Sequence, residues 1–249
     1  MTARILPFVA SPMLLALLST TGCSQPGVPC TAGHGYFAAK YELTQGDPAS
    51  PCGGLLGDVL GLAPYYSAKD GKAPNLEDGS VAIRPEYVNN LIFHALDQGV
   101  ADLSTDPGAQ ALGDFDAADP TEDDFCTAST FPVAEVSIPE VPEVPDDPET
   151  PDEDESIPAQ PATTVSYAWS NVRILVTADA QGTQMSADLR FTQDGCSADY
   201  HAIGVFPAVY CESDEECEDD ANGINPSFKT VCDAGLGLCV LPGEPPVYE

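Results

Sequence analysis

The side chains that could do chemistry in this chain are mostly carboxylates, and they do not single out an active site. Asp114 and Asp116 are spaced as a pair of glycosidase carboxylates could be, but the chain has 40 acidic residues, so such pairs arise from composition alone. His34, His94 and His201 match no metal-binding spacing. We therefore name no catalytic residue and no metal ligand. A non-enzymatic role is favoured, and an exported hydrolase using acidic residues stays open as an alternative.

One acidic loop near the carboxyl end partly matches a calcium-binding pattern. Positions 1, 3, 5 and 6 of an EF-hand loop are matched by Glu218, Asp220, Asn222 and Gly223. Position 12 requires a bidentate Glu, and here it is Lys229. The pattern fails at the residue that would close the site, so we expect no cofactor. A looser calcium site within residues 212–220, which would make the chain a calcium-dependent adhesion module, is kept as an alternative.

The amino terminus has the three parts of a secretory signal. Arg4 precedes an apolar run over residues 5–18, and small residues ending in Gly22 follow. The run is too short for a membrane-spanning helix of about 20 residues. The segment resembles a bacterial lipoprotein signal, which implies that Cys23 is lipidated and becomes the new amino terminus. The lipid would be a diacylglyceryl group with an acyl chain such as palmitate. The alternative is an ordinary signal cut elsewhere, with a free thiol at Cys23.

The cysteine count agrees with this assignment, because nine cysteines leave eight once Cys23 is set aside. Eight cysteines can form four disulfides, which suits an oxidising compartment outside the cytoplasm. Of the 105 connectivities that eight cysteines allow, we expect two local pairs in the tail and two pairs in the body. These pairs are Cys211–Cys232, Cys217–Cys239, Cys30–Cys52 and Cys126–Cys196.

The charge of the chain excludes one class of partner. The formal net charge is −32, from 8 basic and 40 acidic residues. Such a chain repels nucleic acid, so we expect no DNA or RNA binding. The only membrane contact we expect is the lipid anchor.

Hydrophobic patterning must supply the elements that position these residues. Alternation predicts a strand over 36–43, helical spacing predicts a helix over 85–98, and alternation over 163–202 predicts a three-stranded antiparallel meander with a bulge at Asn171. Prolines at every third position from Pro139 to Pro151 lie in an acidic stretch that predicts an extended spacer. The fold class we expect is mainly β with one helix. It is an antiparallel meander in a sandwich- or barrel-like, disulfide-stabilised domain with a disordered acidic Pro-rich segment.

These patterns divide the chain into six segments. The expected order is a signal peptide (1–22), a tether (23–29), a β-rich region (30–134), an acidic Pro-rich linker or inserted loop (135–162), the meander (163–210) and a cysteine-rich module (211–249). Whether 30–134 and 163–210 form one domain is left open.

The tail carries a second resemblance. It reads C-E-S-D-E-E-C at 211–217 and C-D-A-G-L-G-L-C at 232–239, with an acidic run before one cysteine and a glycine shortly before the last. Together with the signal, this resembles the cell-surface lipoproteins of myxobacteria that have a short cysteine-rich module. The resemblance implies a lipid-anchored protein with a binding or structural role and a surface protein or polysaccharide as partner. Ser24, in place of Asp after the lipidated cysteine, implies the outer membrane.

Overall fold

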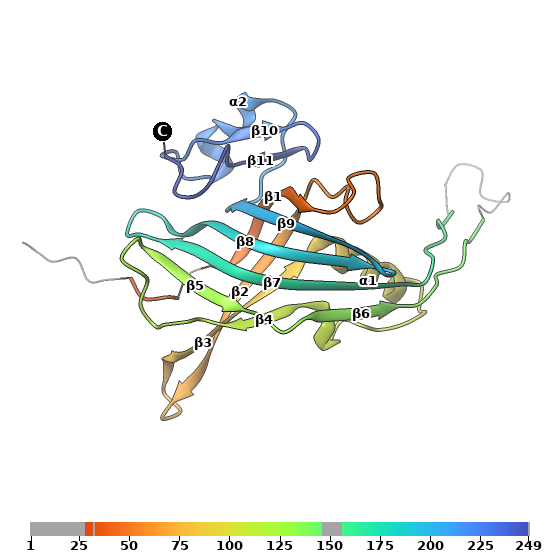
Figure 1. Ribbon diagram of the computed structural model, residues 1–249, viewed down its shortest axis with the longest axis horizontal. Coiled ribbons are helices and arrows are strands. Elements are labelled where there is room, and N and C mark those ends of the chain that lie inside the picture. Colours follow the sequence, from red (N-terminus) through yellow and green to blue (C-terminus); the bar gives the residue numbers. More distant parts are fainter. Residues whose placement is uncertain (1–27, 32, 146–155, 249) are drawn as a thin grey trace, which may run out of the picture.

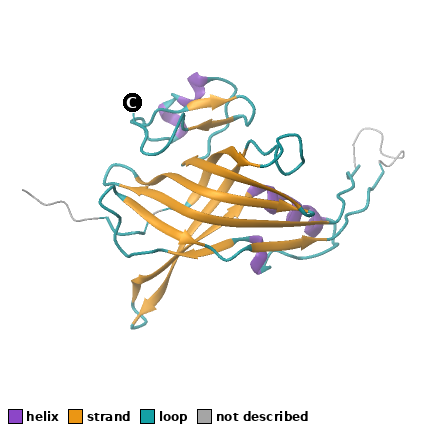
Figure 2. Cartoon of the chain, in the orientation of Figure 1, coloured by secondary structure: helices purple, strands orange, loops and turns teal. Residues whose placement is uncertain are grey.

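A single antiparallel sheet of nine strands dominates the computed structural model, which describes residues 28–31, 33–145 and 156–248 (Figures 1 and 2). The predicted mainly-β, antiparallel fold class is confirmed. The strands are β1 (Gly35–Gln45), β2 (Gly57–Lys69), β3 (Ala73–Pro85), β4 (Ala111–Asp114), β5 (Phe125–Thr130), β6 (Ala134–Ile138), β7 (Thr163–Val176), β8 (Gln181–Gln193) and β9 (Cys196–Val205). The order across the sheet is β4-β3-β2-β1-β9-β8-β7-β5, with β6 paired to β7 beside β5.

The meander of β7, β8 and β9 forms as the alternation predicts. Tyr167 and Trp169 point into the core, and Val172 and Ile174 take over this role after the phase shift. The shift is a bulge, because the register between β7 and β8 changes between Ser170 and Arg173, and Asn171 between them has a φ of 50°. The predicted bulge at Asn171 is therefore confirmed.

The pairing of β1 with β9 joins the first strands of the chain to the meander. Ala38 lies opposite Val205 and Tyr41 opposite Ala202, so the two strands run antiparallel over most of their length. Strands from both predicted β-regions thus lie in one sheet.

The sheet curls until its two edges approach each other. In Figure 1, β1, β2 and β3 cross β7, β8 and β9 at a steep angle. The Asp116 N–H, just beyond β4, donates to the carbonyl of Thr127 in β5 at 2.8 Å. The ring of Phe131 lies so close to Gly113 of β4 that an added Cβ there would come within 2.7 Å of it. The curled sheet therefore encloses one apolar core, in which Phe37, Leu60, Ile83 and Phe191 are fully buried.

A helix, α1 (Glu86–Asp97), leaves the end of β3 and packs into one end of the curled sheet. Val88, Ile92 and Ala95 form its buried face, and Gly99 ends it with a φ of 66°, which confirms the predicted helix. A short 3₁₀ turn, η1 (Pro107–Ala109), precedes β4. Within the described residues, no helix combines the length and apolarity that crossing a membrane requires.

The acidic Pro-rich segment differs from the expected spacer at both of its ends. Residues 135–138 belong to β6, where Val136 pairs with Val165 of β7. Beyond it, Val141 bridges Gln160 and Val144 bridges Ile157, which makes the segment a hairpin-like insertion between β6 and β7. The ends of the segment are ordered because its valines and isoleucine reach the end of the core. Its prolines are tolerated there because an edge position does not require a backbone N–H for a ladder hydrogen bond. The middle of the predicted spacer, 146–155, lies outside the described residues.

The cysteine-rich module covers the outer face of the sheet beside β1 and β9 (Figure 1). It contains α2 (Asp214–Cys217), η2 (Asp220–Asn222), β10 (Val231–Asp233) and β11 (Leu238–Val240). Phe228 and Leu238 of the module pack in one cluster with Ala38 and Val205 of the sheet. The buried amide of Gln184 fastens the end of the chain, since it exchanges two hydrogen bonds of 2.9 Å with the backbone of Val247.

All eight expected cysteines are paired in the structure, but two of the four expected pairs are wrong. Cys211–Cys232 and Cys217–Cys239 occur as expected. The body pairs Cys30–Cys126 and Cys52–Cys196 replace Cys30–Cys52 and Cys126–Cys196. The reason is the β1–β9 pairing, which brings the loop after β1 to the start of β9 and so places Cys52 beside Cys196.

The two long-range disulfides generate the first prediction. Digestion of the unreduced protein with a Glu-specific protease, followed by mass spectrometry, should recover Cys30 linked to Cys126 and Cys52 linked to Cys196. Replacing both Cys52 and Cys196 by Ser should lower the free energy of unfolding by about 5 kcal/mol, because the bridge closes a loop of 144 residues. Recovery of a Cys30–Cys52 peptide would contradict the topology.

Candidate ligand-binding groove

The residues singled out from sequence lie at separate places in the structure. Cys23 falls outside the described residues. His34 packs edge-on against Phe206, His94 lies in α1, and His201 lies in β9. The three imidazoles therefore do not form a common site.

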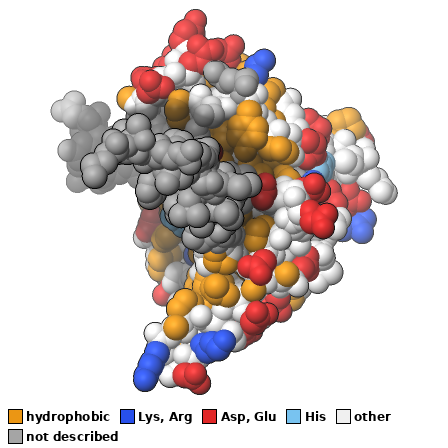
Figure 3. Space-filling model, turned by 90° about the vertical axis from the view of Figure 1, so that its left-hand side faces the viewer, with side chains coloured by type: hydrophobic (Ala, Val, Ile, Leu, Met, Phe, Trp, Pro, Cys, Tyr) orange, Lys and Arg blue, Asp and Glu red, His pale blue; other side chains and the backbone are white. Residues whose placement is uncertain are grey.

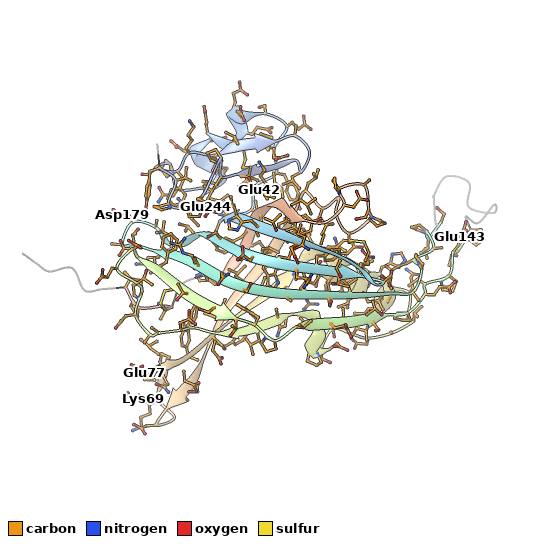
Figure 4. The ribbon with its side chains drawn as sticks, viewed as in Figure 1. Glu42, Lys69, Glu77, Glu143, Asp179 and Glu244 are labelled. Atoms are coloured by element: carbon orange, nitrogen blue, oxygen red, sulfur yellow. A yellow bond between two sulfur atoms is a disulfide. The ribbon has the colours of Figure 1, made fainter. Side chains whose placement is uncertain are left out.

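His201 has a structural role between the sheet and the chain end. Its Nδ1 lies 3.0 Å from Asp188 of β8, and its Nε2 contacts Glu244, which Figure 4 labels between the module and the sheet. Burial disfavours the charged ring, but the hydrogen bond to Asp188 and the charge of Glu244 outweigh it and raise the pKa of His201. The ring therefore helps to hold the carboxyl-terminal segment on the sheet.

The paired carboxylates Asp114 and Asp116 also have a structural explanation. Asp116 accepts hydrogen bonds from the hydroxyl of Ser129 at 2.7 Å and from its N–H at 3.2 Å. Partial burial opposes ionisation of Asp116, but the bonds from Ser129 and Thr127 outweigh it and lower the pKa of the carboxyl. Asp116 thus joins the end of β4 to β5, and it does not pair with Asp114 across a cleft.

The calcium-like loop uses its side chains to cap its own backbone. Asp219 accepts from the N–H of Ala221 at 2.9 Å, and the amide of Asn222 donates to the carbonyls of Glu216 and Cys217. The loop borders a depression of about 750 Å³, whose acidic side chains do not converge. Among the described residues, one group of potential metal-ligating atoms lies close together, the sulfurs of Cys211, Cys217 and Cys239, and all three are in disulfides.

A different surface has the features of a binding site, and it lies across three neighbouring strands. Strand register places Tyr36 of β1, Gly61 of β2 and Arg84 of β3 in one row. Their neighbours Phe37, Leu60 and Ile83 are core residues, so the row lies on the opposite, outer face of the sheet. We call the surface around this row the groove.

The groove is a depression of about 540 Å³ with a floor of small residues. Gly61, Ala63 and Ala82 form the floor, since strand pairing sets Ala63 beside Ala82 in the next row. One wall comes from α1, whose Glu86, Asn89 and Phe93 share a face at helical spacing, and Gln110 closes the margin. The groove is hollow because its floor lacks large side chains, and no inserted loop is needed to form it.

Two exposed aromatic rings border this floor. Tyr36 is 70% exposed and Phe93 is 42% exposed, although large apolar side chains are mostly buried in this fold. Exposed rings beside convergent polar groups are typical of a surface that takes a ligand.

Arg84 is the polar centre of the groove, and its guanidinium lacks a partner. Its Nε and Nη2 are buried and make no hydrogen bond to any described residue. The other two arginines of the described part have partners, because Arg190 pairs with Asp199 at 3.1 Å and Arg173 lies over the ring of Phe125. A buried donor without an acceptor is costly, so a ligand oxygen that reached the guanidinium from the groove would gain a hydrogen bond that the described residues do not supply.

Comparison with known proteins places this sheet in a family. A sequence model of the MlpA family matches residues 35–207. The chain belongs to the MlpA family. The match begins with β1 and ends just beyond β9, so the MlpA region contains the groove, and the cysteine-rich module lies outside it.

A relative covers most of the chain as well. The chain is 27% identical over 248 residues to a Myxococcus xanthus protein named as a candidate lipoprotein, MlpA, with 92% of each chain covered. The expected resemblance to myxobacterial lipoproteins is thereby confirmed. No solved structure matches the chain.

Sequence reasoning missed the groove because its residues come from distant positions. The signal that could have indicated it is Arg84, one of only 8 basic residues, placed between an apolar strand and a helix.

The unpartnered guanidinium generates the second prediction. Replacing Arg84 by Met should leave the free energy of unfolding within about 1 kcal/mol of the natural protein, because the substitution removes buried donors that no protein group satisfies. Ile83→Ala at the adjacent, fully buried position should cost about 3 kcal/mol. Chemical denaturation measures both. A loss at Arg84 as large as that at Ile83 would show that the guanidinium has a structural partner.

Proposed function

We propose that this protein is a lipid-anchored binding protein of the outer membrane and that its groove binds a polysaccharide of the cell envelope. The observation that carries the proposal is the unpartnered Arg84 between the exposed rings of Tyr36 and Phe93. Sugar rings pack their apolar faces on aromatic side chains, and the sugar hydroxyls need hydrogen-bond donors and acceptors in several directions. Arg84, Glu86, Asn89 and Gln110 supply both kinds of group along the groove.

The charge of the protein favours a neutral polysaccharide over an acidic one. Acidic side chains are spread over the face in Figure 3 and are more prominent there than basic ones, some of which lie at the bottom, near the tip of the β2–β3 hairpin where Figure 4 labels Lys69. A polyanion would be repelled before it reached the groove. Neutral sugar hydroxyls carry no such penalty and can still accept from Arg84.

The third prediction tests the groove by affinity electrophoresis in gels containing neutral polysaccharides (laminarin, mannan or galactan), with alginate as the acidic counterpart. At least one neutral polysaccharide should retard the protein. Tyr36→Ala should weaken that binding about tenfold, because a stacked ring is lost. Gly61→Val should abolish it, because a Cβ at Gly61 fits at 3.5 Å from the nearest atom but fills the floor.

Tyr210→Ala is the matched control for the groove, since Tyr210 is also 70% exposed and lies elsewhere. The control should bind as the natural protein does. Binding should also persist in a chelator, because no calcium site is required. Retardation by none of the neutral polysaccharides, or equal losses at Tyr36 and Tyr210, would contradict the proposal.

The alternative of an exported hydrolase has one observation in its favour, which is that Asp58 and Glu86 line one depression. Incubating the retarding polysaccharide with the protein and analysing the products by mass spectrometry separates the two functions. Unchanged polysaccharide supports binding, whereas shortened chains that disappear in Asp58→Asn would show hydrolysis.

The fourth prediction concerns the anchor. The mature protein extracted from membranes should begin at Cys23 and carry a diacylglyceryl group and an acyl chain, which intact mass measures directly. Cys23→Ala should shift the protein from the membrane to the soluble fraction, because no other attachment is expected. Density-gradient fractionation should place the natural protein with outer-membrane markers. An unlipidated mass for the membrane-bound natural protein would contradict the anchor.

A further inference from the structure

A second depression lies on the inner side of the sheet, where α1 meets the end of the curled strands. Its volume is about 240 Å³. Its main lining residues are Tyr41, Asp58, Glu86, Tyr87, Asn90 and Tyr167. We call it the tyrosine pocket. The pocket and the groove share Glu86 at the start of α1, but they lie on opposite faces of the sheet. Asp58 lies two residues before the core residue Leu60 on β2, so it points to the inner face, opposite Gly61.

Asp58 is held at the amino-terminal end of α1. Both of its carboxylate oxygens lie 3.3 Å from the N–H of Tyr87, which donates to them. Glu86, the first residue of the helix, lines the same pocket. The two carboxylates are therefore neighbours. Within the described part of the chain, Asp58 forms no ion pair, and the pocket lining contains no Lys, Arg or His.

Three tyrosines complete the lining, and one of them has an unsatisfied hydroxyl. Tyr41 is only 5% exposed, and its hydroxyl is buried without a hydrogen-bond partner among the described residues. Tyr167 is 3% exposed and stacks on Trp169, with ring centres 6.3 Å apart. Tyr87 is fixed by its hydroxyl, which donates to the side chain of Gln193 at 3.1 Å. Tyr87 and Tyr167 are thus held in place by contacts within the protein.

We propose that the tyrosine pocket binds a small organic cation, with a primary or quaternary ammonium group seated between Asp58 and the rings of Tyr41, Tyr87 and Tyr167. Phenol rings attract a cation through their negative faces, and a carboxylate without a counter-ion supplies the matching charge. A hard metal ion is a poorer fit, because calcium takes 6–8 oxygen ligands and the lining offers two carboxylates among aromatic side chains. The site does not depend on the polysaccharide groove.

The protonation of Asp58 couples this binding to pH. Burial raises the pKa of Asp58 to about 7; the N–H groups of Tyr87 and Val59 oppose the rise, and the charge of Glu86 adds to it. The polar groups that face Asp58 from the surrounding elements are Tyr41 of β1, Tyr167 of β7, and Glu86, Tyr87 and Asn90 of α1. Because the cation requires the ionised carboxylate, the affinity should rise with pH. It should be about tenfold weaker at pH 6 than at pH 8.

The fifth prediction tests this site with tetramethylammonium and choline as probes, at constant ionic strength. Trp169 is the sole tryptophan and stacks on Tyr167, so its fluorescence reports on the pocket, and calorimetry gives the dissociation constant independently. Saturable binding is expected at pH 8, with the tenfold loss at pH 6. Tert-butanol, a neutral molecule of similar size, should bind at least tenfold more weakly.

Asp58→Asn is the decisive variant. It should weaken binding of both cations at pH 8 by much more than the tenfold loss expected at pH 6, because no ionised carboxylate remains. Asp78→Asn removes one charge from an exposed position on β3 and should have no effect. Asp58→Asn should also fold. Its melting temperature should exceed that of the natural protein at pH 8 and match it near pH 4. The unfolded chain ionises Asp58 near pH 4, whereas the folded protein ionises it only near pH 7, so the natural protein loses stability as the pH rises through this range.

Three results would overturn the proposal. They are absence of saturable cation binding at pH 8, equal binding of tert-butanol, and full affinity in Asp58→Asn. Arg84→Met and Gly61→Val should retain cation binding, so a failure of the polysaccharide groove and a failure of the tyrosine pocket can be told apart. Displacement of the probes by micromolar calcium would reassign the pocket to a metal ion and would also overturn the organic-cation assignment.

Discussion

The antiparallel pairing of β1 with β9 is the contact on which the rest of the structure depends. It joins strands that are more than 150 positions apart, and it turns a small meander into a sheet long enough to curl and enclose a core. The same pairing brings Cys52 to Cys196 and provides the outer face on which the cysteine-rich module packs. Closing such a distant contact costs much chain entropy, which the buried aromatic residues and the long-range bridges offset.

The parts of the fold that follow from local patterns were predictable from the sequence. The meander, the bulge at Asn171 and helix α1 each have a periodicity contained in one stretch of chain. The disulfides of the module agree with the expected pairs, and both are formed within one stretch of about 30 residues. The body disulfides and the ordered ends of the Pro-rich segment were not, because both depend on which strands become neighbours.

Neither pocket could be predicted, for the same physical reason. The row of Tyr36, Gly61 and Arg84 exists because three strands align in one register, and a single residue of slippage would turn these side chains into the core. The tyrosine pocket likewise combines β1, β2, β7 and α1. The chain has so many acidic residues that the sequence does not single out Asp58. Asp58 differs from the other carboxylates in its three-dimensional surroundings and not in its sequence neighbours. The unusual feature that sequence does show is the rare basic residue, and Arg84 is one.

The bridge between Cys30 and Cys126 would have a mechanical consequence for the lipid anchor proposed at Cys23. Seven residue steps separate Cys23 from Cys30, a reach of about 25 Å at full extension. A pull from such an anchor would therefore meet a covalent bond to β5 before it reached the first hydrogen bonds of β1. The load would pass into the far edge of the sheet, spread through the ladder between β5 and β7, and bypass the strand whose pairing holds the fold together.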